Sequence, residues 1–327
     1  MFDPNKIRGL KVLVLGDVML DSYFFGKVDR ISPEAPVPVV AVQRKENRLG
    51  GAANVALNLK ALGAEPILCS VTGKDEDGKL FRKLLRKHKI DDSGIIESLF
   101  RITTVKTRVI GNNHQILRVD HESILPLNQT EEKLFLQMVA KLLPSADVVI
   151  FEDYDKGLLT ANNISAIIDL ATKQKIPTVV DPKKLNFMSY KGATLFKPNL
   201  KELREGLKTD HEIRSLEEIR KAAHQLQKKL DVQMVMVTLS EGGIFICDKK
   251  KHYHIPAHIR KIADVSGAGD TVISVAAICL ALKLPIQQIA EISNLAGGLV
   301  CEEVGVVPIN LQKLIKELPH SVSTYIG

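Results

Sequence analysis

The sequence predicts an α/β protein in which a mostly parallel β-sheet is covered on both faces by helices. Continuous apolar runs without polar alternation recur along the chain, at residues 11–15, 148–151, 178–180 and 234–237. Segments of helical periodicity lie between them, at residues 52–62, 131–143, 163–173 and 216–230. Strands that are apolar on both faces and alternate with helices are typical of a parallel sheet buried between two helix layers.

Two segments, about residues 22–45 and 101–121, interrupt this alternation. They have the pattern of short strands of mixed polarity, and prolines break the first of them. Such strands favour a small antiparallel sheet that lies over one edge of the main sheet as a lid. No linker, low-complexity segment or repeat divides the sequence, so we expect one domain over residues 1–327 with a discontinuous lid.

The composition indicates an ordinary globular protein. The chain has 327 residues, of which 45% are hydrophobic and 25% charged, enough for one large core or two modest ones. A net charge of +7 suits ligands that carry phosphate groups. Because the chain has no Trp and only 5% aromatic residues, we do not expect it to bind nucleic acid.

The cysteines and the N-terminus indicate the compartment. The four cysteines are scattered through apolar stretches, which predicts buried free thiols in a reducing cytosol. Residues 1–8 lack the apolar core of a signal peptide, and the longest apolar run, residues 272–284, is too short to span a bilayer. We therefore expect a cytoplasmic protein without a membrane partner.

Acidic residues follow the predicted strands directly. Asp17 ends the first strand, with Asp21 close behind it, and Asp153 and Asp181 follow two later strands. In a parallel sheet, ligands bind beyond the carboxyl ends of the strands. Two neighbouring carboxylates, such as Asp17 and Asp21, suit a polyol because each can accept two hydroxyl hydrogen bonds.

A glycine-rich loop enters the helix predicted to begin at residue 52. Gly50 and Gly51 would let the backbone approach a ligand closely, and Asn54 can both donate to and accept from hydroxyl groups. An ordinary glycine-rich turn with an Asn in the first helical turn is an equally good interpretation of this segment alone.

The most informative segment is the octet at residues 264–271. Gly267, Ala268 and Gly269 form a small-residue turn that opens an apolar helix, and such a turn binds anions through its free amides and the helix dipole. A carboxylate beside a bound phosphate would be repelled, so Asp270 makes most sense as a base that takes a proton from the group attacking the phosphate. Alternatively, Asp270 only caps the helix.

Together, the octet and residues 50–56 resemble the two signatures of the ribokinase/PfkB family of sugar kinases. They occur in the expected order, more than two hundred residues apart. The resemblance implies a ribokinase-like three-layer sandwich, ATP as phosphoryl donor and Mg²⁺, and it leaves open whether a monovalent cation such as K⁺ is needed. It also implies that the lid covers the sugar and forms a homodimer contact.

The same resemblance assigns further residues. It favours Asp17 over Asp21 as the acid that holds the sugar, since Asp21 can equally be a turn residue. Asn199 and Glu202 match the motif that organises magnesium near the nucleotide phosphates, although Asn199 can instead cap a helix. The remaining nucleotide contacts that the resemblance implies are Thr238, Ser240, Gly242 and Gly243, in a loop after a strand, and Asn294 near the adenine.

Five further segments resemble bacterial D-glycero-β-D-manno-heptose-7-phosphate kinases, namely residues 30–39, 106–110, 115–122, 153–157 and 181–183. Those enzymes phosphorylate the anomeric hydroxyl to give the 1,7-bisphosphate, a precursor of ADP-heptose and lipopolysaccharide. The sugar phosphate needs cations, and together with Asp153 the candidates for the substrate site are Arg108, Arg118, Lys156 and Lys183. Many relatives carry a second, nucleotidyltransferase domain, a step that we expect a separate partner to perform here.

Several positions depart from that pattern. Asp155 and Lys184 stand where glycine is usual, His114 where glutamine is usual and Lys197 where threonine is usual. The alternatives are therefore a kinase of another sugar or sugar phosphate, such as ribose, fructose or fructose phosphate, and a sugar-phosphate sensor without turnover. His252, His254 and His258 form a loose cluster, but no carboxylate or thiol completes a zinc site.

Overall fold

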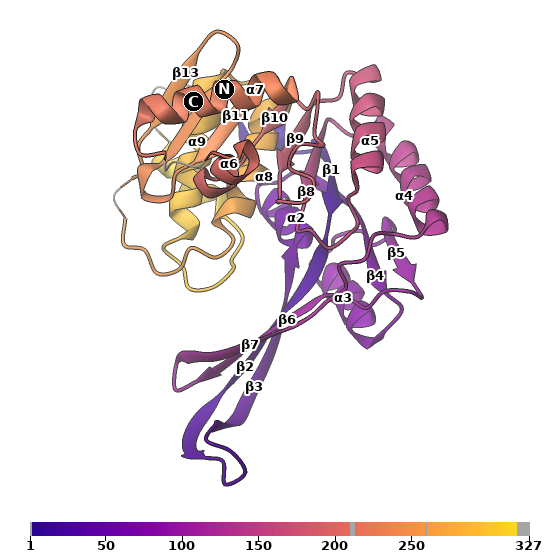
Figure 1. Ribbon diagram of the computed structural model, residues 1–327, viewed down its shortest axis with the longest axis vertical. Helices are drawn as coiled ribbons and strands as arrows, with labels where there is room; N and C mark the ends of the chain where they lie inside the picture. The colour runs from indigo at the N-terminus through magenta and orange to yellow at the C-terminus, as the bar shows by residue number, and fades with distance from the viewer. Residues whose placement is uncertain (1, 210–212, 259, 319–327) are drawn as a thin grey trace.

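A central sheet forms the middle layer of the structure, a computed structural model that describes residues 2–209, 213–258 and 260–318 (Figure 1). The sheet has nine strands in the order β13-β12-β11-β10-β9-β8-β1-β4-β5. Their bounds along the chain are β1 Lys11–Gly16, β4 Glu65–Gly73, β5 Ile95–Ser98, β8 Val148–Glu152, β9 Thr178–Asp181, β10 Leu195–Phe196, β11 Met234–Thr238, β12 Ile244–Cys247 and β13 His252–Ile255.

From β11 to β5 all neighbouring strands are parallel, and β12 and β13 add an antiparallel edge. The prediction of a mostly parallel sheet is therefore confirmed. The first strand shows why its sequence has no polar alternation, since Val12 and Val14 belong to one hydrophobic cluster while Leu13 and Leu15 belong to another. Both faces of the strand are buried, so both sets of side chains must be apolar.

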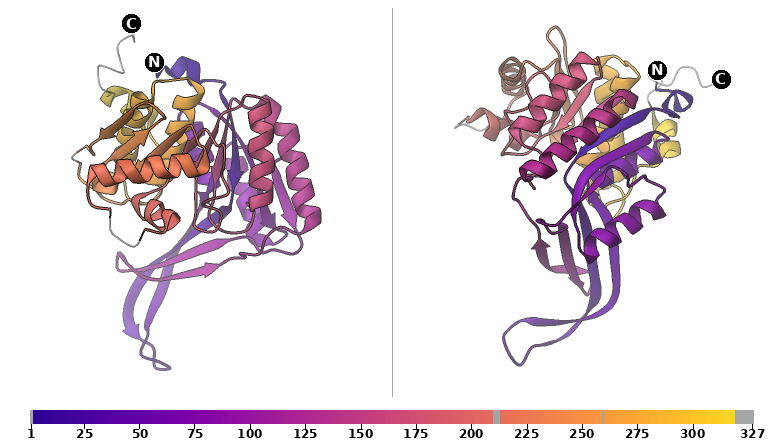
Figure 2. Two further views of the ribbon diagram at one scale, coloured as in Figure 1. Left: turned by 45° about the horizontal axis from the view of Figure 1, so that its top comes forward. Right: turned by 90° about the vertical axis from the view of Figure 1, so that its right-hand side faces the viewer.

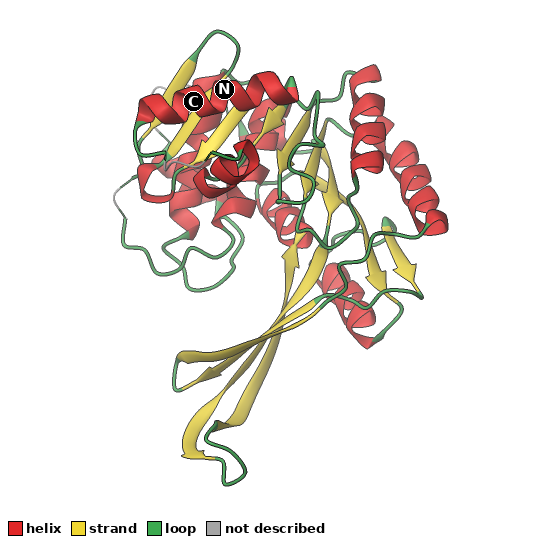
Figure 3. Ribbon diagram, in the orientation of Figure 1, coloured by secondary structure: helices red, strands yellow, loops and turns green. Residues whose placement is uncertain are grey.

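Helices cover both faces of the sheet (Figures 2 and 3). One face packs against α2 Ala52–Ala61, α3 Glu76–Lys87, α8 Ala268–Ala281, α9 Ile286–Val300 and α10 Leu311–Glu317. The other packs against α4 Gln129–Leu142, α5 Ala161–Lys173, α6 Leu200–Leu207 and α7 Leu216–Leu230. The chain also has α1 Pro4–Ile7 and the short 3₁₀ helices η1 Leu143–Ser145 and η2 Ser240–Gly242.

The helix boundaries follow local capping chemistry. Asn128, Thr160 and Ser215 each begin a helix by accepting a hydrogen bond from the amide three residues later, and the side chain at that position returns a bond to the cap. These reciprocal bonds satisfy amides that have no partner within the helix. The predicted helices agree with α2, α4, α5 and α7 to within two residues at each end, and of these four only α2 begins without a side-chain cap.

The lid is a second sheet of four strands in the order β3-β2-β6-β7 that extends away from the main body (Figure 1). It consists of β2 Val18–Ile31, β3 Pro38–Gly51, β6 Val105–Gly111 and β7 His114–His121. The expectation of an antiparallel lid is correct for two of its pairings, but β2 and β6 are parallel. Between β2 and β6 the chain forms β3, α2, β4, α3 and β5, so the lid is assembled from two separate parts of the sequence.

The structure also shows the state of the cysteines and the apolar character of the helices. All four cysteines are buried and free. Across the part of the chain that the structure describes, no helix combines the length and the apolar character needed to cross a membrane.

Candidate active site

The predicted anion turn lies at the start of α8. Gly267 precedes the helix with φ of 79°, a left-handed conformation in which a side chain would be strained. A Cβ at Gly267 would also lie 3.1 Å from Nδ2 of Asn54 and 3.1 Å from Cγ1 of Val306. Of the three predicted amides, that of Ala268 already donates to the carbonyl of Val265 at 3.3 Å. The turn is therefore tightly built around Gly267.

Asp270 lies in the first turn of α8 and is buried. Oδ2 accepts a hydrogen bond from Nδ2 of Asn54 at 2.6 Å, and Oδ1 accepts one from the hydroxyl of Tyr154 at 3.0 Å. Burial raises the pKa of Asp270 to about 6, and the two hydrogen bonds and the charge of Lys197 oppose that rise. The carboxyl is thus charged at neutral pH but can take up a proton readily.

The glycine-rich loop joins the lid to α2. Gly50 and Gly51 end β3, and a Cβ at Gly50 would clash with the carboxylate of Asp21, whereas one at Gly51 would clash with the carbonyl of Asp17. Asn54 in the first turn of α2 is buried, and its Oδ1 has no hydrogen-bond partner. The two predicted signatures therefore meet through Asn54 and Asp270, which are 216 residues apart in the sequence.

Asp21 lies in strand β2 of the lid rather than in a turn. Its Oδ1 accepts a hydrogen bond from Nη1 of Arg108 in β6 at 2.6 Å. Arg108 and Arg48 both lie over the ring of Tyr23, at 5.3 Å and 5.0 Å from its centroid. Two guanidinium groups therefore surround one aromatic ring next to the glycine-rich loop.

Asp17 anchors the loop that follows β8. Its Oδ2 accepts hydrogen bonds from the amides of Tyr154 and Lys156 at 3.0 and 3.1 Å, and its Oδ1 accepts one from the amide of Leu158 at 3.2 Å. Burial, together with the charge of Asp153, raises the pKa of Asp17 to about 6. The acid that was expected to hold the sugar thus has both oxygens bound by backbone amides.

The other candidate substrate residues lie in different surroundings. The carboxylate of Asp153 is buried, and it accepts hydrogen bonds from the amide of Asp155 and from the side chains of Asn186 and Tyr190. Arg118 is exposed on β7 and pairs with Asp120 at 3.0 Å. In the described part of the chain, neither Asp153 nor Arg118 forms a hydrogen bond or an ion pair with Asp270 or Asn54.

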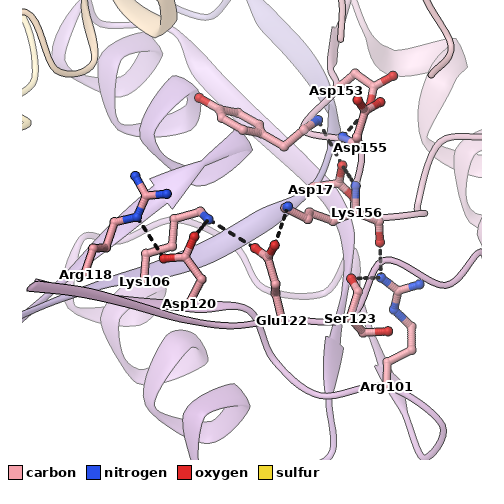
Figure 4. A network of polar contacts seen from close by, with 11 residues as sticks. Asp17, Arg101, Lys106, Arg118, Asp120, Glu122, Ser123, Asp153, Asp155 and Lys156 are labelled. Carbon is pink, nitrogen blue, oxygen red and sulfur yellow. Dashed lines mark hydrogen bonds and ion pairs between the residues drawn. The ribbon is translucent and has the colours of Figure 1, made fainter. Parts of the chain in front are cut away.

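Lys156 and Lys183 each pair with a carboxylate. The ammonium of Lys156 binds Glu122 at 2.7 Å, and Glu122 also binds Lys106 of β6 at 3.1 Å (Figure 4). Lys183 binds Glu202 at 3.1 Å, so it belongs to the predicted nucleotide side. Figure 4 shows Lys156 between Asp17 and Glu122, the residue that follows β7 of the lid.

The predicted nucleotide residues gather at the ends of β10 and β11. Asn199 and Glu202 form a reciprocal capping box at the start of α6, with bonds of 2.8 and 2.9 Å. Asn199 also forms a parallel bridge with Thr238. The following loop, with Ser240, Gly242 and Gly243, turns through η2, and Asn294 of α9 donates to the carbonyl of Pro256 at 2.8 Å.

The profile of the pfkB family carbohydrate kinases matches residues 10–313 of this chain. The chain belongs to that family. It is therefore a carbohydrate kinase, a phosphotransferase whose acceptor is an alcohol group.

Curated relatives of this carbohydrate kinase are longer. Bifunctional protein HldE from Syntrophotalea carbinolica is 38% identical over 324 residues, which cover 98% of this chain and 65% of the relative. The protein of the same name from Methylobacillus flagellatus is 41% identical over 310 residues, or 94% of this chain and 63% of the relative. The chain thus spans less than two thirds of the length of these relatives.

Solved structures share the fold of this carbohydrate kinase. Phosphofructokinase-2 from Escherichia coli in complex with potassium has a TM-score of 0.80 at 20% identity, over 94% of this chain and 97% of that chain. Ribokinase from Arabidopsis thaliana complexed with ribose and ATP has a TM-score of 0.74 at 17% identity, over 94% and 98%. The predicted ribokinase-like fold is confirmed.

Sequence reasoning missed three residues beside Asp270 in this carbohydrate kinase. Tyr154 contacts it directly, and Lys197 pairs with Asp181 at 2.8 Å close to Gly269. Glu152 is buried with Oε2 unpartnered, and burial and the charges of Asp181 and Asp270 raise its pKa well above the usual range. Two of the three carried a sequence signal, since Glu152 ends an apolar strand and Tyr154 lies in the segment 153–157 that resembles heptose-7-phosphate kinases. Lys197 has no such signal.

Asn199 and Glu202 are the predicted protein partners of magnesium. Across residues 2–209, 213–258 and 260–318, no three His, Cys, Asp or Glu side chains are grouped to hold a metal ion. Both oxygens of Glu202 already have partners, Lys183 and the amide of Asn199. These residues fit a magnesium ion that is held mainly by phosphate oxygens and water, as Mg²⁺ commonly is at nucleotides.

Proposed function

We propose that this carbohydrate kinase transfers the γ-phosphoryl group of ATP to the anomeric hydroxyl of D-glycero-β-D-manno-heptose 7-phosphate. The observation that carries the proposal is the hydrogen bond between Asn54 and Asp270, because it joins the sugar-site motif to a buried carboxylate at the anion turn. The substrate is inferred from the five segments that resemble heptose-7-phosphate kinases and from the relatives named HldE.

In the proposed mechanism Asp270 takes the proton of the attacking hydroxyl. A carboxyl with a pKa of about 6 is ionised at neutral pH and close enough to that pH to act as a general base. The turn at Gly267 and Gly269, with the positive end of the α8 dipole, would stabilise the charge that develops on the transferring oxygens. The lid would exclude water from the reaction.

The nucleotide would lie along the ends of β10 and β11, at Asn199 and the loop from Thr238 to Gly243. Magnesium bound to its phosphates would neutralise their charge, with Asn199 and Glu202 as the nearest protein partners. Asn294 would help to form the adenine pocket, because its hydrogen bond to the carbonyl of Pro256 holds that loop in place.

The phosphate of the sugar would bind near Arg108. This guanidinium and that of Arg48 are partly exposed, with 22% and 29% of each side chain accessible, and both lie near Asp21 and Gly50. Arginine suits phosphate because its planar donors can bind two oxygens at once. Asp21 would then contact a hydroxyl of the sugar, and Asp17 would position the loop beneath it.

The first test is ADP release with ATP and Mg²⁺, with and without K⁺, across heptose 7-phosphate, fructose 6-phosphate, fructose, ribose and no sugar. We expect kcat/KM with heptose 7-phosphate to exceed that with any other sugar by at least ~100-fold, since a site built for polar groups rejects ligands that lack them. Turnover with another sugar would keep the mechanism and overturn the substrate. No turnover with any sugar would favour a sensor.

We also propose a homodimer through the lid. Strand β7 is exposed along its whole length, and Leu117 and Val119 lie on one face of it with 54% and 49% of their surfaces accessible. Apolar side chains gathered on an edge strand indicate a protein interface.

Replacing Leu117 and Val119 by Asp is expected to convert the dimer to monomer, because charges would have to be buried in the contact. Sedimentation equilibrium measures this change. Leu134→Asp, an exposed position on α4 away from the lid, is the matched control and should remain dimeric. A wild-type protein that sediments as a monomer at all concentrations would contradict the proposal.

A further inference from the structure

The carboxylate of Asp270 is held by two donors from separate parts of the fold. Asn54 comes from α2 and belongs to the sugar-site motif, whereas Tyr154 comes from the loop after β8. Each donor binds a different carboxylate oxygen. The hydroxyl of Tyr154 lies 3.0 Å from Oδ1 of the proposed base, within hydrogen-bond distance.

Tyr154 is fixed independently of Asp270. Its amide and that of Lys156 donate to Oδ2 of Asp17, and the side chain of Lys156 is bound by Glu122 at the end of the lid. Arg101 donates to the carbonyl of Lys156 from a third direction. Figure 4 shows how Asp17, Glu122 and Arg101 surround Lys156, so the loop that carries Tyr154 has little freedom to move.

Charged side chains at the ends of three strands of the main sheet act on Asp270. Asp181 of β9 and Glu152 of β8 add negative charge, and Lys197 after β10 adds positive charge, while burial disfavours the ionised form most strongly. Without these donors the pKa of the carboxyl would be higher still, and a protonated carboxyl cannot act as a base. The hydroxyl of Tyr154 and the amide of Asn54 oppose that tendency.

The two donors differ in what they can do when a sugar binds. Oδ1 of Asn54 is buried and has no partner, which indicates an acceptor that awaits a donor such as a sugar hydroxyl. The hydroxyl of Tyr154 donates its single proton to Asp270, and the ammonium of Lys183 lies 5.2 Å from the ring centroid of Tyr154. Asn54 is therefore suited to turn toward the substrate, while Tyr154 stays with the base.

We propose that Tyr154 is a positioning residue for phosphoryl transfer, whose hydroxyl orients Asp270 and keeps it ionised while Asn54 engages the sugar. The inference rests on the proposed role of Asp270 as the general base. It adds a residue that neither family signature contains.

The test is the pH dependence of kcat in Tyr154→Phe, a variant that keeps the ring and removes only the hydroxyl. We expect kcat at neutral pH to fall by about 10- to 100-fold, as for loss of a hydrogen bond to a charged group. Because the lost donor stabilised the ionised form, the acid limb of the profile should move to higher pH. KM for ATP and for the sugar should change less than about threefold, since neither is bound by the phenol.

The chain offers a matched control in Tyr190, whose hydroxyl donates to the carboxylate of Asp153 at 2.7 Å. Tyr190→Phe removes the same kind of bond from a carboxylate that does not contact Asp270, so its acid limb should stay in place. Thermal unfolding of both variants checks that each is folded. If Tyr154→Phe does not fold, a fluorinated tyrosine at position 154 strengthens the donor and should move the limb to lower pH.

Three outcomes would decide against the inference or its premise. A Tyr154→Phe profile that matches wild type overturns it, and so does an equal shift in Tyr190→Phe. A wild-type profile without an acid limb, together with an active Asp270→Asn, instead overturns the proposed base itself.

Discussion

Replacing Asp270 by Asn is expected to lower kcat by about two to four orders of magnitude, the range for loss of a general base. The amide has nearly the same shape and can still accept a hydrogen bond from Asn54 or Tyr154, so the site should keep its geometry. Affinity for the nucleotide should barely change, because the base acts on the sugar hydroxyl. Steady-state kinetics and nucleotide titration measure the two effects.

The pH profile gives a second measure of the same group. Since the pKa of Asp270 is about 6, wild-type activity should be full above that pH and fall below it as the base becomes protonated. The folded-state pKa lies above the unfolded value, so the charged form is disfavoured in the fold at pH values above 6. Asp270→Asn should therefore raise the thermal midpoint at pH 8 while it lowers activity.

Glu131→Gln is a suitable control for this experiment. It removes the charge of another buried carboxyl, one that forms the capping box of α4 and lies outside the site. Its turnover should stay within the same order as wild type. Near-normal turnover of Asp270→Asn would mean that another group takes the proton.

Replacing Lys197 by Met is expected to lower the free energy of unfolding by about 3–5 kcal/mol, the usual effect of removing one partner of a buried ion pair. Lys197 and Asp181 are 2.8 Å apart, and their side chains are only 4% and 7% exposed. Without the ammonium, the buried carboxylate of Asp181 would face Glu152 and Asp270 with only the more distant and partly exposed Lys183 as a counter-charge. Urea unfolding monitored by circular dichroism measures the change.

Two further variants make this prediction specific. Combining Lys197→Met with Asp181→Asn removes both charges and should recover much of the lost stability. Lys249→Met breaks a pair with Asp231 that is exposed on both sides and should leave the unfolding midpoint nearly unchanged. An unfolding free energy of Lys197→Met within about 1 kcal/mol of wild type would contradict the argument, since a buried charge left unpaired has a larger effect.

The strands and helices that the sequence predicted are those with a strong local pattern, a continuous apolar run or a helical periodicity. The apolar run at residues 11–15 must be a strand buried on both faces, and caps such as Ser215 fix where helices begin. The lid was visible as mixed-polarity segments, since a thin sheet with exposed faces cannot be wholly apolar. The parallel pairing of β2 with β6 was not visible, because register between distant strands leaves no local pattern.

The sequence by itself determined which residues the proposed site is built from, namely the glycines at the predicted anion turn, Asp270 within it and the Gly50–Asn54 loop. Their roles rest on backbone freedom and functional groups that the residues carry in any context. Only the tertiary structure decided the partners: that Asn54 and Tyr154 hold Asp270, that Asp17 binds a loop, that Asp153 faces Tyr190 and that Lys197 meets Asp181. Tyr154 and Asp270 are 116 residues apart, and packing of the strands and helices against one another, rather than any local preference, brings such side chains into contact.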